Sequence, residues 1–127
     1  MADVNRGKRP LSPHLTIYRP QLSSMSSIFI RITGVGLLVS FVMIVAWIGS
    51  AAVSEDCFAK MNAFVTSWFG QLILIASLWA LWYHFLGGIR HLIFDLGYGL
   101  DLKSADMMSW IMIIGSFVMT ALTVLVF

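Results

Sequence analysis

Three long stretches of the sequence contain no Asp, Glu, Lys or Arg, and they constrain the fold more than any other feature. They run from Ile32 to Ser54, from Met61 to Ile89 and from Met107 to the C-terminal Phe127. About 20 apolar residues are enough for a helix to cross a bilayer, and backbone amides in hydrocarbon must find partners within their own segment. The pattern therefore predicts three transmembrane helices. A secretory signal is a competing interpretation of the first stretch, which is much longer than the roughly 7–15 residues of a signal core.

The composition excludes several classes of protein. Hydrophobic residues make up 59% of the 127 residues and charged residues 11%, against roughly 45–50% and 25% in soluble domains. A chain this short cannot bury such an excess in a core of its own, so a soluble monomer and a disordered chain are both excluded. The single Cys57 leaves no internal disulfide and no cysteine cluster for zinc or iron–sulfur centres. A net charge of +2 gives no indication of a nucleic-acid partner.

Prolines mark the N-terminal arm, residues 1–23. Pro10, Pro13 and Pro20 lack amide donors and disfavour a helix, so we expect this arm to be extended at the inner membrane face. Its apolar side chains favour packing on another protein over a free tail.

The whole chain, residues 1–127, is expected to form one all-α membrane-anchor domain that is completed by the helices of a partner subunit. Gly97 and Gly99 are typical of a helix end, so the second helix should stop near Leu96. The transmembrane helices are accordingly predicted at about residues 24–54, 61–96 and 106–127. Seven of the eight Lys and Arg residues then lie on the side of the N-terminus, and only Lys60 lies on the other. The positive-inside rule therefore places the N-terminus in the cytoplasm or matrix.

His84 is the first candidate site residue. It lies six residues before Arg90, which on a helix is about 9 Å deeper in the membrane. An imidazole among aromatic and aliphatic neighbours requires an explanation, and neutral imidazole is a good ligand for haem iron. Gly87 and Gly88 would let a flat macrocycle approach the helix. The alternative is a histidine hydrogen-bonded across helices, with glycines that serve helix packing, and the residues alone leave both interpretations open.

The neighbours of His84 add a geometric constraint. His84, His91 and Asp95 share one helix face, and two histidines on one face cannot ligate opposite sides of one haem. A second axial histidine would therefore have to come from another chain. His91 and Arg90 are placed to donate to haem propionates, or else they extend to the membrane surface as long polar side chains commonly do. Asp95 belongs to a proton path or pairs with Arg90 or His91.

Ser27 and Arg31 form the second candidate site. They are four residues apart and share a helix face. Serines often cap a helix, and an arginine at a membrane boundary often reaches for water. A hydroxyl beside a guanidinium also suits the carbonyl of a hydrophobic quinone, because hydrogen bonds to a developing oxyanion stabilise the reduced form.

Four motifs occur in order along the chain. They are Arg9-Pro10-Leu11-Ser12-Pro13-His14 with Ile17-Tyr18, then Ser27 with Arg31-Ile32-Thr33-Gly34, then His84 with Gly88-Ile89-Arg90-His91, and finally Asp95-Leu96-Gly97. In these motifs and in their placement against three helices, the chain resembles the cytochrome b membrane-anchor subunits of succinate dehydrogenase (respiratory complex II). The resemblance covers nearly the whole chain, and its most specific part runs from His84 to Asp95.

The resemblance implies a role for individual residues. His84 takes the position of the axial iron ligand of one haem b, whose second axial histidine belongs to a sister anchor subunit. Ser27 and Arg31 take quinone-site positions, with Ile28 nearby. Ile30 stands where the family usually has His or Tyr, so polar contacts to haem are expected from Arg31 and His91 instead.

The resemblance also implies partners and a location. FAD and iron–sulfur clusters reside in a flavoprotein and an iron–sulfur subunit that oxidise succinate to fumarate. This chain anchors them in the lipid bilayer and helps to reduce ubiquinone. No transit peptide precedes the first motif, which favours a bacterial inner membrane over the mitochondrial one.

Two alternatives remain at this stage. A quinol:fumarate reductase anchor shares the same layout and runs the reaction in the other direction. A small non-redox carrier or accessory subunit would explain three helices and a buried histidine. It would not explain why the polar candidates all gather toward the inner leaflet, because a carrier places such residues near the midplane.

Overall fold

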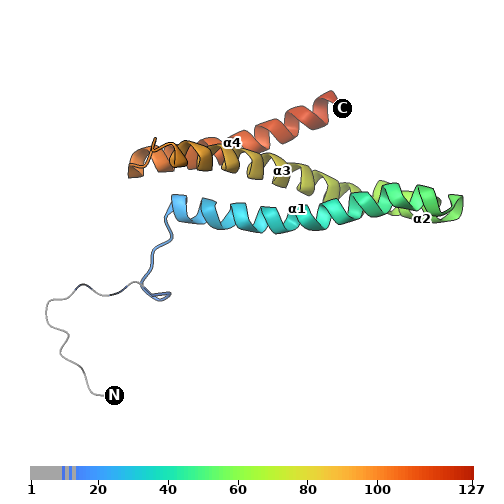
Figure 1. The fold of residues 1–127 in the computed structure, drawn as a ribbon, viewed down its shortest axis with the longest axis horizontal. Coiled ribbons are helices and arrows are strands. Elements are labelled where there is room, and N and C mark those ends of the chain that lie inside the picture. Colours follow the sequence, from blue (N-terminus) through green and yellow to red (C-terminus); the bar gives the residue numbers. More distant parts are fainter. Residues whose placement is uncertain (1–9, 11, 13) are drawn as a thin grey trace, which may run out of the picture.

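The computed structural model describes residues 10, 12 and 14–127, and it contains four α-helices (Figure 1). They are α1 (Leu22–Val53), α2 (Glu55–Thr66), α3 (Trp68–Asp95) and α4 (Leu102–Val126). Helices α1, α3 and α4 are long and apolar enough to cross a membrane. The prediction of an all-α bundle with three transmembrane helices is confirmed, and the described residues form no strand.

The chain runs along the length of the molecule three times (Figure 1). Helix α1 leads from the arm to the far end, where α2 folds back beside its last turns. Helix α3 continues back to the first end and contacts both α1 and α4. Helix α4 then runs outward again and diverges from α3 toward its C-terminus (Figure 1). Near the end where α1 and α4 begin, side-chain hydrogen bonds of Ser26 join α1 to both α3 and α4.

The helix boundaries differ from the predicted ones at polar residues that cap helices. The predicted helix at 61–96 is broken at Ser67, whose hydroxyl accepts from the amide of Gly70 at 3.2 Å and starts α3 anew. Similarly, Asp101 accepts from the amide of Ser104 at 3.0 Å, so α4 begins at Leu102 rather than near 106. Helix α1 covers 22–53 rather than 24–54. Helix α3 ends at Asp95, just before Gly97 and Gly99 take positive φ values of 82° and 68°, as the glycines predicted.

The described part of the N-terminal arm is exposed and ends at Gln21, two residues earlier than predicted. Residues 15–17 form a turn, in which the amides of Ile17 and Tyr18 donate to the carbonyl of His14. Several residues on which the sequence predictions rest lie outside the described residues, namely Arg6, Lys8, Arg9, Leu11 and Pro13.

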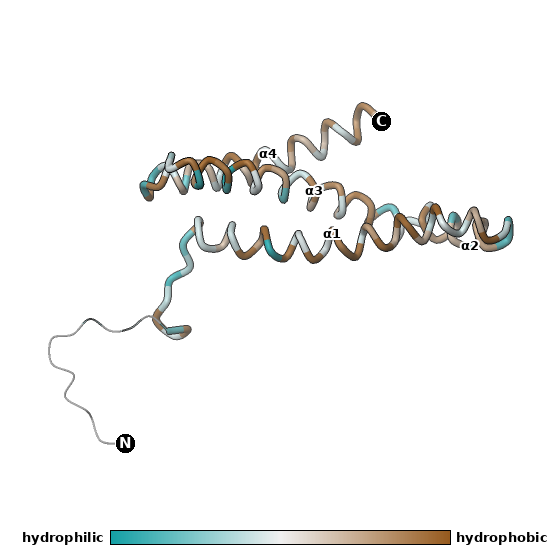
Figure 2. Tube along the Cα trace, viewed as in Figure 1, coloured by the Kyte–Doolittle hydropathy of each residue, from teal (hydrophilic) through white to brown (hydrophobic). Residues whose placement is uncertain are grey.

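Small polar side chains, together with the buried Tyr83 and Met112, fill the contacts between the long helices. Ser26, Thr33, Ser40 and Ser50 are buried along α1, and the hydroxyls of Ser40 and Ser77 bond α1 to α3 at 2.6 Å. Most of the other large apolar side chains point outward, and the brown, hydrophobic stretches of Figure 2 run along all three long helices. Small residues let helices approach closely in a membrane, where lipid tails solvate the apolar surface.

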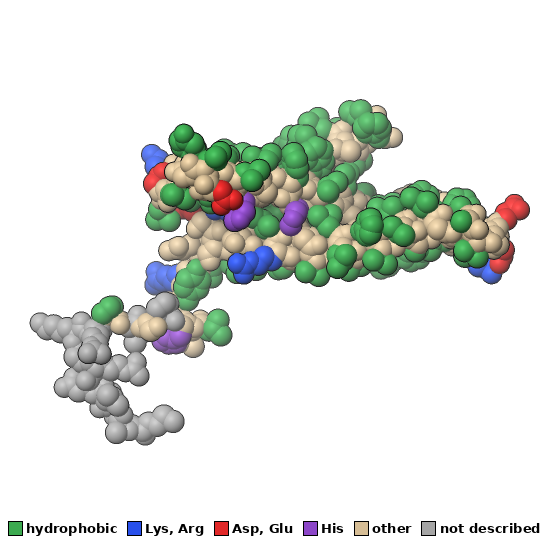
Figure 3. Space-filling model, viewed as in Figure 1, with side chains coloured by type: hydrophobic (Ala, Val, Ile, Leu, Met, Phe, Trp, Pro, Cys, Tyr) green, Lys and Arg blue, Asp and Glu red, His purple; other side chains and the backbone are tan. Residues whose placement is uncertain are grey.

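Charged side chains gather at the two ends of the bundle (Figure 3). The far end carries Glu55, Asp56 and Lys60, where the ammonium of Lys60 bonds to the carboxylate of Asp56 at 2.7 Å. Arginine and histidine side chains lie toward the other end, where α1 and α4 begin (Figure 3). The long apolar section between these ends suits the hydrocarbon core of a bilayer.

Candidate functional site

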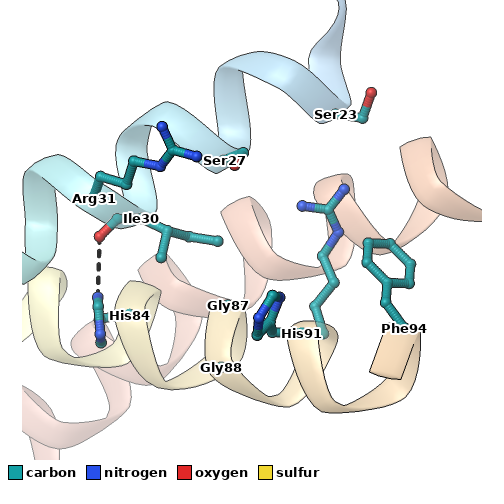
Figure 4. A pocket seen from close by; sticks show the side chains of 10 residues that line it. Ser23, Ser27, Ile30, Arg31, His84, Gly87, Gly88, His91 and Phe94 are labelled. Carbon is teal, nitrogen blue, oxygen red and sulfur yellow. Dashed lines mark hydrogen bonds between the residues drawn. The ribbon is translucent and has the colours of Figure 1, made fainter. Parts of the chain in front are cut away.

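A cavity of about 510 Å³ lies between α1 and α3, toward the end of the bundle where α1 begins (Figure 4). Four residues of α1 and six of α3 line it, namely Ser23, Ser27, Ile30 and Arg31, and His84, Gly87, Gly88, Arg90, His91 and Phe94. It brings together four of the predicted site residues, Ser27, Arg31, His84 and His91. The fifth, Ile28, is not among the lining residues, and its side chain is 45% exposed.

The imidazole of His84 is held by a hydrogen bond to the neighbouring helix. Its Nδ1 lies 3.1 Å from the carbonyl oxygen of Ile30, as Figure 4 shows. A carbonyl oxygen can only accept, so Nδ1 carries the proton and donates it. In a neutral imidazole the lone pair then remains on Nε2. The arrangement leaves one ring nitrogen able to bind a metal.

The two adjacent glycines of α3 play different parts. Gly87 is buried where α3 crosses α1, and a Cβ there would lie 2.7 Å from the side chain of Ile30 and 3.2 Å from the sulfur of Met112. Gly88 is exposed in the cavity wall, and a Cβ there would meet nothing within 4 Å. Gly87 therefore serves helix packing, and only Gly88 opens space beside His84.

Ser27 and Arg31 contribute hydrogen-bond donors to the α1 wall of the cavity. The side chain of Arg31 extends along α1 toward Ser27, opposite the α3 wall that carries His84 and His91 (Figure 4). Ser27 is partly buried and Arg31 is exposed. A molecule that entered the cavity would meet a hydroxyl and a positively charged guanidinium on one side and two imidazoles on the other.

Of the two sequence-based interpretations of Arg90, extension to the membrane surface is wrong, and donation to a haem propionate stays a prediction. Arg90 is only 7% exposed, and its guanidinium donates to the hydroxyl of Ser26 at 3.1 Å and to the carbonyl of Ala105 at 3.5 Å. Its Cζ lies 4.8 Å from the centre of the Phe94 ring. The hydroxyl of Ser26 also bonds to that of Ser109 at 3.2 Å. The sequence alone could not show this, because the bonding partners come from α1 and α4. Arg90 therefore ties α1, α3 and α4 together while it also lines the cavity.

His91 and Asp95 lie nearer the end of α3. Both are exposed, and His91 contributes to the cavity lining whereas Asp95 does not. Among the described residues, Asp95 forms no salt bridge or side-chain hydrogen bond with His91 or Arg90, and Arg90 bonds to Ser26 and Ala105 instead. The predicted pair is therefore absent, and the predicted role of Asp95 in a proton path stays a prediction.

Two lining residues, Ser23 and Phe94, were not predicted from the sequence. Ser23 precedes Ser27 by four residues and Arg31 by eight, so helical periodicity could have placed all three on one face. Phe94 carries no such signal, because an aromatic residue near a membrane boundary is ordinary.

The comparisons with known proteins agree with this architecture. A family model described as the succinate dehydrogenase/fumarate reductase transmembrane subunit matches residues 5–123. The succinate dehydrogenase cytochrome b556 subunit of Paracoccus denitrificans is 50% identical over 127 residues, which are 100% of this chain and 98% of that relative. The corresponding subunit of Rickettsia conorii is 37% identical over 115 residues, which are 91% and 90% of the two chains. The cytochrome b560 subunit of Marchantia polymorpha is 44% identical over 100 residues, or 75% of this chain and 73% of the relative. The chain therefore belongs to the family of succinate dehydrogenase and fumarate reductase transmembrane subunits.

Proposed function

We propose that this chain is the cytochrome b membrane anchor of a succinate:ubiquinone oxidoreductase, with half of a haem b site and part of a quinone-reduction site. The observation that carries the proposal is that one cavity brings His84 of α3 opposite Ser27 and Arg31 of α1. The relatives' printed names, succinate dehydrogenase cytochrome b556 and b560 subunits, support both the complex and the cofactor.

The residues of the cavity fit a haem. His84 offers Nε2 because its Nδ1 is bonded to Ile30, and Gly88 leaves open space in which a Cβ would meet no neighbour. His91 and Arg31 are the cavity residues available to the negatively charged propionates. When bound, the haem supplies one-electron redox chemistry. His84 would hold the haem iron from this chain, and the family resemblance implies that a partner anchor subunit would supply the other histidine.

Ser27 and Arg31 act on the quinone. Ubiquinone takes up two electrons, delivered from the iron–sulfur subunit, and two protons, and its two carbonyl oxygens become the hydroxyls of ubiquinol. Negative charge builds up on a carbonyl oxygen whenever an electron arrives before its proton. A guanidinium is always protonated and stabilises that charge, while the hydroxyl of Ser27 donates a second hydrogen bond to the same oxygen.

The remaining cofactors and partners belong to other chains. A flavoprotein subunit with FAD and an iron–sulfur subunit oxidise succinate, and they dock on the inner face of the membrane, where the cavity also lies. The N-terminus and the basic residues near the cavity lie on that inner face, as the positive-inside rule requires. The bacterial relatives support a bacterial inner membrane as the location.

The experiment that tests the proposal replaces His84 with Leu in the assembled complex. We expect most haem to be lost, or to become loosely held and high-spin, because one of two iron ligands is removed. The apolar replacement suits the membrane, so the chain should still insert. The measurement is a reduced-minus-oxidised optical spectrum, with haem quantified per flavin.

His14→Leu is the matched control, because His14 lies in the exposed arm outside the cavity. It should leave the haem spectrum unchanged. An unaltered low-spin haem in the His84→Leu complex would reject the ligand assignment. Absence of a b-type haem band from the native complex, together with absence of a copurifying flavoprotein, would reject the proposed function.

A further inference from the structure

The imidazole of His84 lies against α1 at a position that has no side chain. A Cβ at Gly34 would lie 3.0 Å from Cε1 of His84, 3.5 Å from Nδ1 and 4.0 Å from Nε2. The first of these distances is shorter than ordinary van der Waals contact. The imidazole ring of His84 therefore occupies the space that a side chain at position 34 would fill.

The same gap exposes the carbonyl group to which His84 is bonded. A helical side chain leans toward the N-terminus and covers the turn before its own Cα, so residue 34 is the one that would cover the carbonyl of residue 30. Because residue 34 is Gly, Nδ1 of His84 reaches the carbonyl oxygen of Ile30 at 3.1 Å, a contact drawn in Figure 4. The hydroxyl of the buried Thr33 donates to the same carbonyl at 2.9 Å and to that of Phe29 at 2.9 Å. This turn of α1 is thus held by bonds of its own.

We propose that Gly34 is a positioning residue for His84: it opens the carbonyl of Ile30 to Nδ1, which fixes the ring's orientation and leaves Nε2 as the ligating atom. The inference rests on the proposed role of His84 as a haem ligand. A hydrogen bond donated by the distal ring nitrogen fixes the tautomer and makes the ligating nitrogen more basic. A more basic ligand stabilises the ferric state, so this contact lowers the midpoint potential of the haem.

Substitutions at Gly34 test the proposal in the assembled complex. In Gly34→Ala the added methyl group should displace the ring by a few tenths of an ångström and weaken the bond to Ile30. We expect the haem to remain bound, with a midpoint potential above that of the native complex. In Gly34→Val the larger side chain should remove the bond, with a several-fold loss of low-spin haem per flavin. The measurements are haem content, the optical spectrum and a redox titration of the haem.

Gly36 provides the matched control on the same helix. A Cβ at Gly36 would meet nothing within 4 Å, so Gly36→Ala and Gly36→Val should keep the native haem content and potential. Copurification of the flavoprotein and iron–sulfur subunits with this chain reports assembly in every variant. If Gly34→Val does not assemble, the potential of Gly34→Ala decides alone.

The outcomes separate this inference from the function on which it rests. A Gly34→Ala complex with a raised potential, beside an unchanged Gly36→Ala complex, supports the positioning role. Gly34 variants whose haem content and potential equal those of the Gly36 variants overturn it, even if His84→Leu loses its haem. Retention of low-spin haem in His84→Leu would instead overturn the ligand itself.

Discussion

Ser27 and Arg31 face the cavity from successive turns of α1, and their chemistry differs from that of the imidazoles opposite. A hydroxyl and a guanidinium both donate hydrogen bonds, whereas the neutral imidazole of His84 offers a lone pair. The cavity therefore has a donor wall on α1 and an imidazole wall on α3. Hydrogen-bond donors that meet a quinone carbonyl should bind its reduced, charged form more strongly than the neutral one.

Removal of either donor is expected to slow quinone reduction more than it weakens quinone binding. Loss of one donor to a developing oxyanion typically costs on the order of 10²–10³ in rate. Ser27→Ala and Arg31→Leu should therefore lower succinate:ubiquinone turnover strongly. Succinate oxidation with a water-soluble acceptor should persist, because that step occurs in other subunits. Both activities are to be measured on the same purified complexes.

Two nearby residues serve as controls for this pair. Ser24 lies on α1 and Arg19 in the arm, and neither lines the cavity. Ser24→Ala and Arg19→Leu should keep both activities. An equal loss of the two activities in the Ser27 and Arg31 variants, or unimpaired quinone reduction, would remove these residues from the site.

At the scale of helices, hydropathy predicted the long helices well and their ends poorly. A transmembrane stretch is defined by an apolar average over about 20 residues, and one serine hardly changes that average. Ser67 nevertheless ends α2 and caps α3 through a local bond to the amide of Gly70. Periodicity likewise placed His84, Gly88 and His91 on one face of α3. It could not show that Arg90 turns inward, because Ser26 and Ala105 are remote in sequence.

Asp101 gives the start of α4 a pH dependence. Hydrogen bonds from the backbone amide and the side chain of Ser104 lower the pKa of Asp101 below its ordinary value of 3.8. The carboxylate is therefore the form that stabilises the helix start. Its contribution is fully present above pH 3.8 and is lost as the pH falls through the lower pKa of the folded state.

Removal of this cap should loosen the first turn of α4. Asp101→Ala should raise hydrogen–deuterium exchange of residues 102–105 several-fold at neutral pH, and Asp101→Asn should raise it less, because Asn also caps helices well. The measurement is exchange by mass spectrometry, corrected for the intrinsic effect of pH. The difference between the native chain and Asp101→Ala should vanish only at pH values below 3.8. Lys103→Ala, an exposed neighbour, should show native exchange. Equal protection of Asp101→Ala and the native chain at neutral pH would rule out a stabilising cap.

At the scale of the whole molecule, the outer surface of the bundle is apolar, and most of the side chains buried between its helices are small. Large side chains such as Val35, Val39 and Phe117 are more than half exposed, which lipid tolerates and water does not. On the face that Figure 3 shows, the charged side chains of the described residues lie toward the two ends. The cavity lies at the end that is expected to face the cytoplasm or matrix, where electrons from succinate would arrive. Orientation is therefore the property of the whole molecule on which the proposed function depends.

Cys57 allows that orientation to be measured with the native sequence. It is the single cysteine of the chain and lies partly exposed on α2, at the end opposite the cavity. With the N-terminus inside, a membrane-impermeant maleimide should label Cys57 in intact spheroplasts.

Lys103→Cys in a Cys57→Ser background places the thiol at the exposed start of α4 instead, and it should react only after permeabilisation. Mass spectrometry of this chain identifies the labelled site. Ala59→Cys, at an exposed position of α2, repeats the labelling measurement on the same side of the membrane as Cys57. Labelling of the thiol at position 103 in intact cells, with the α2 thiols protected until permeabilisation, would show that the orientation is inverted. The cavity would then lie on the wrong side for electrons from succinate.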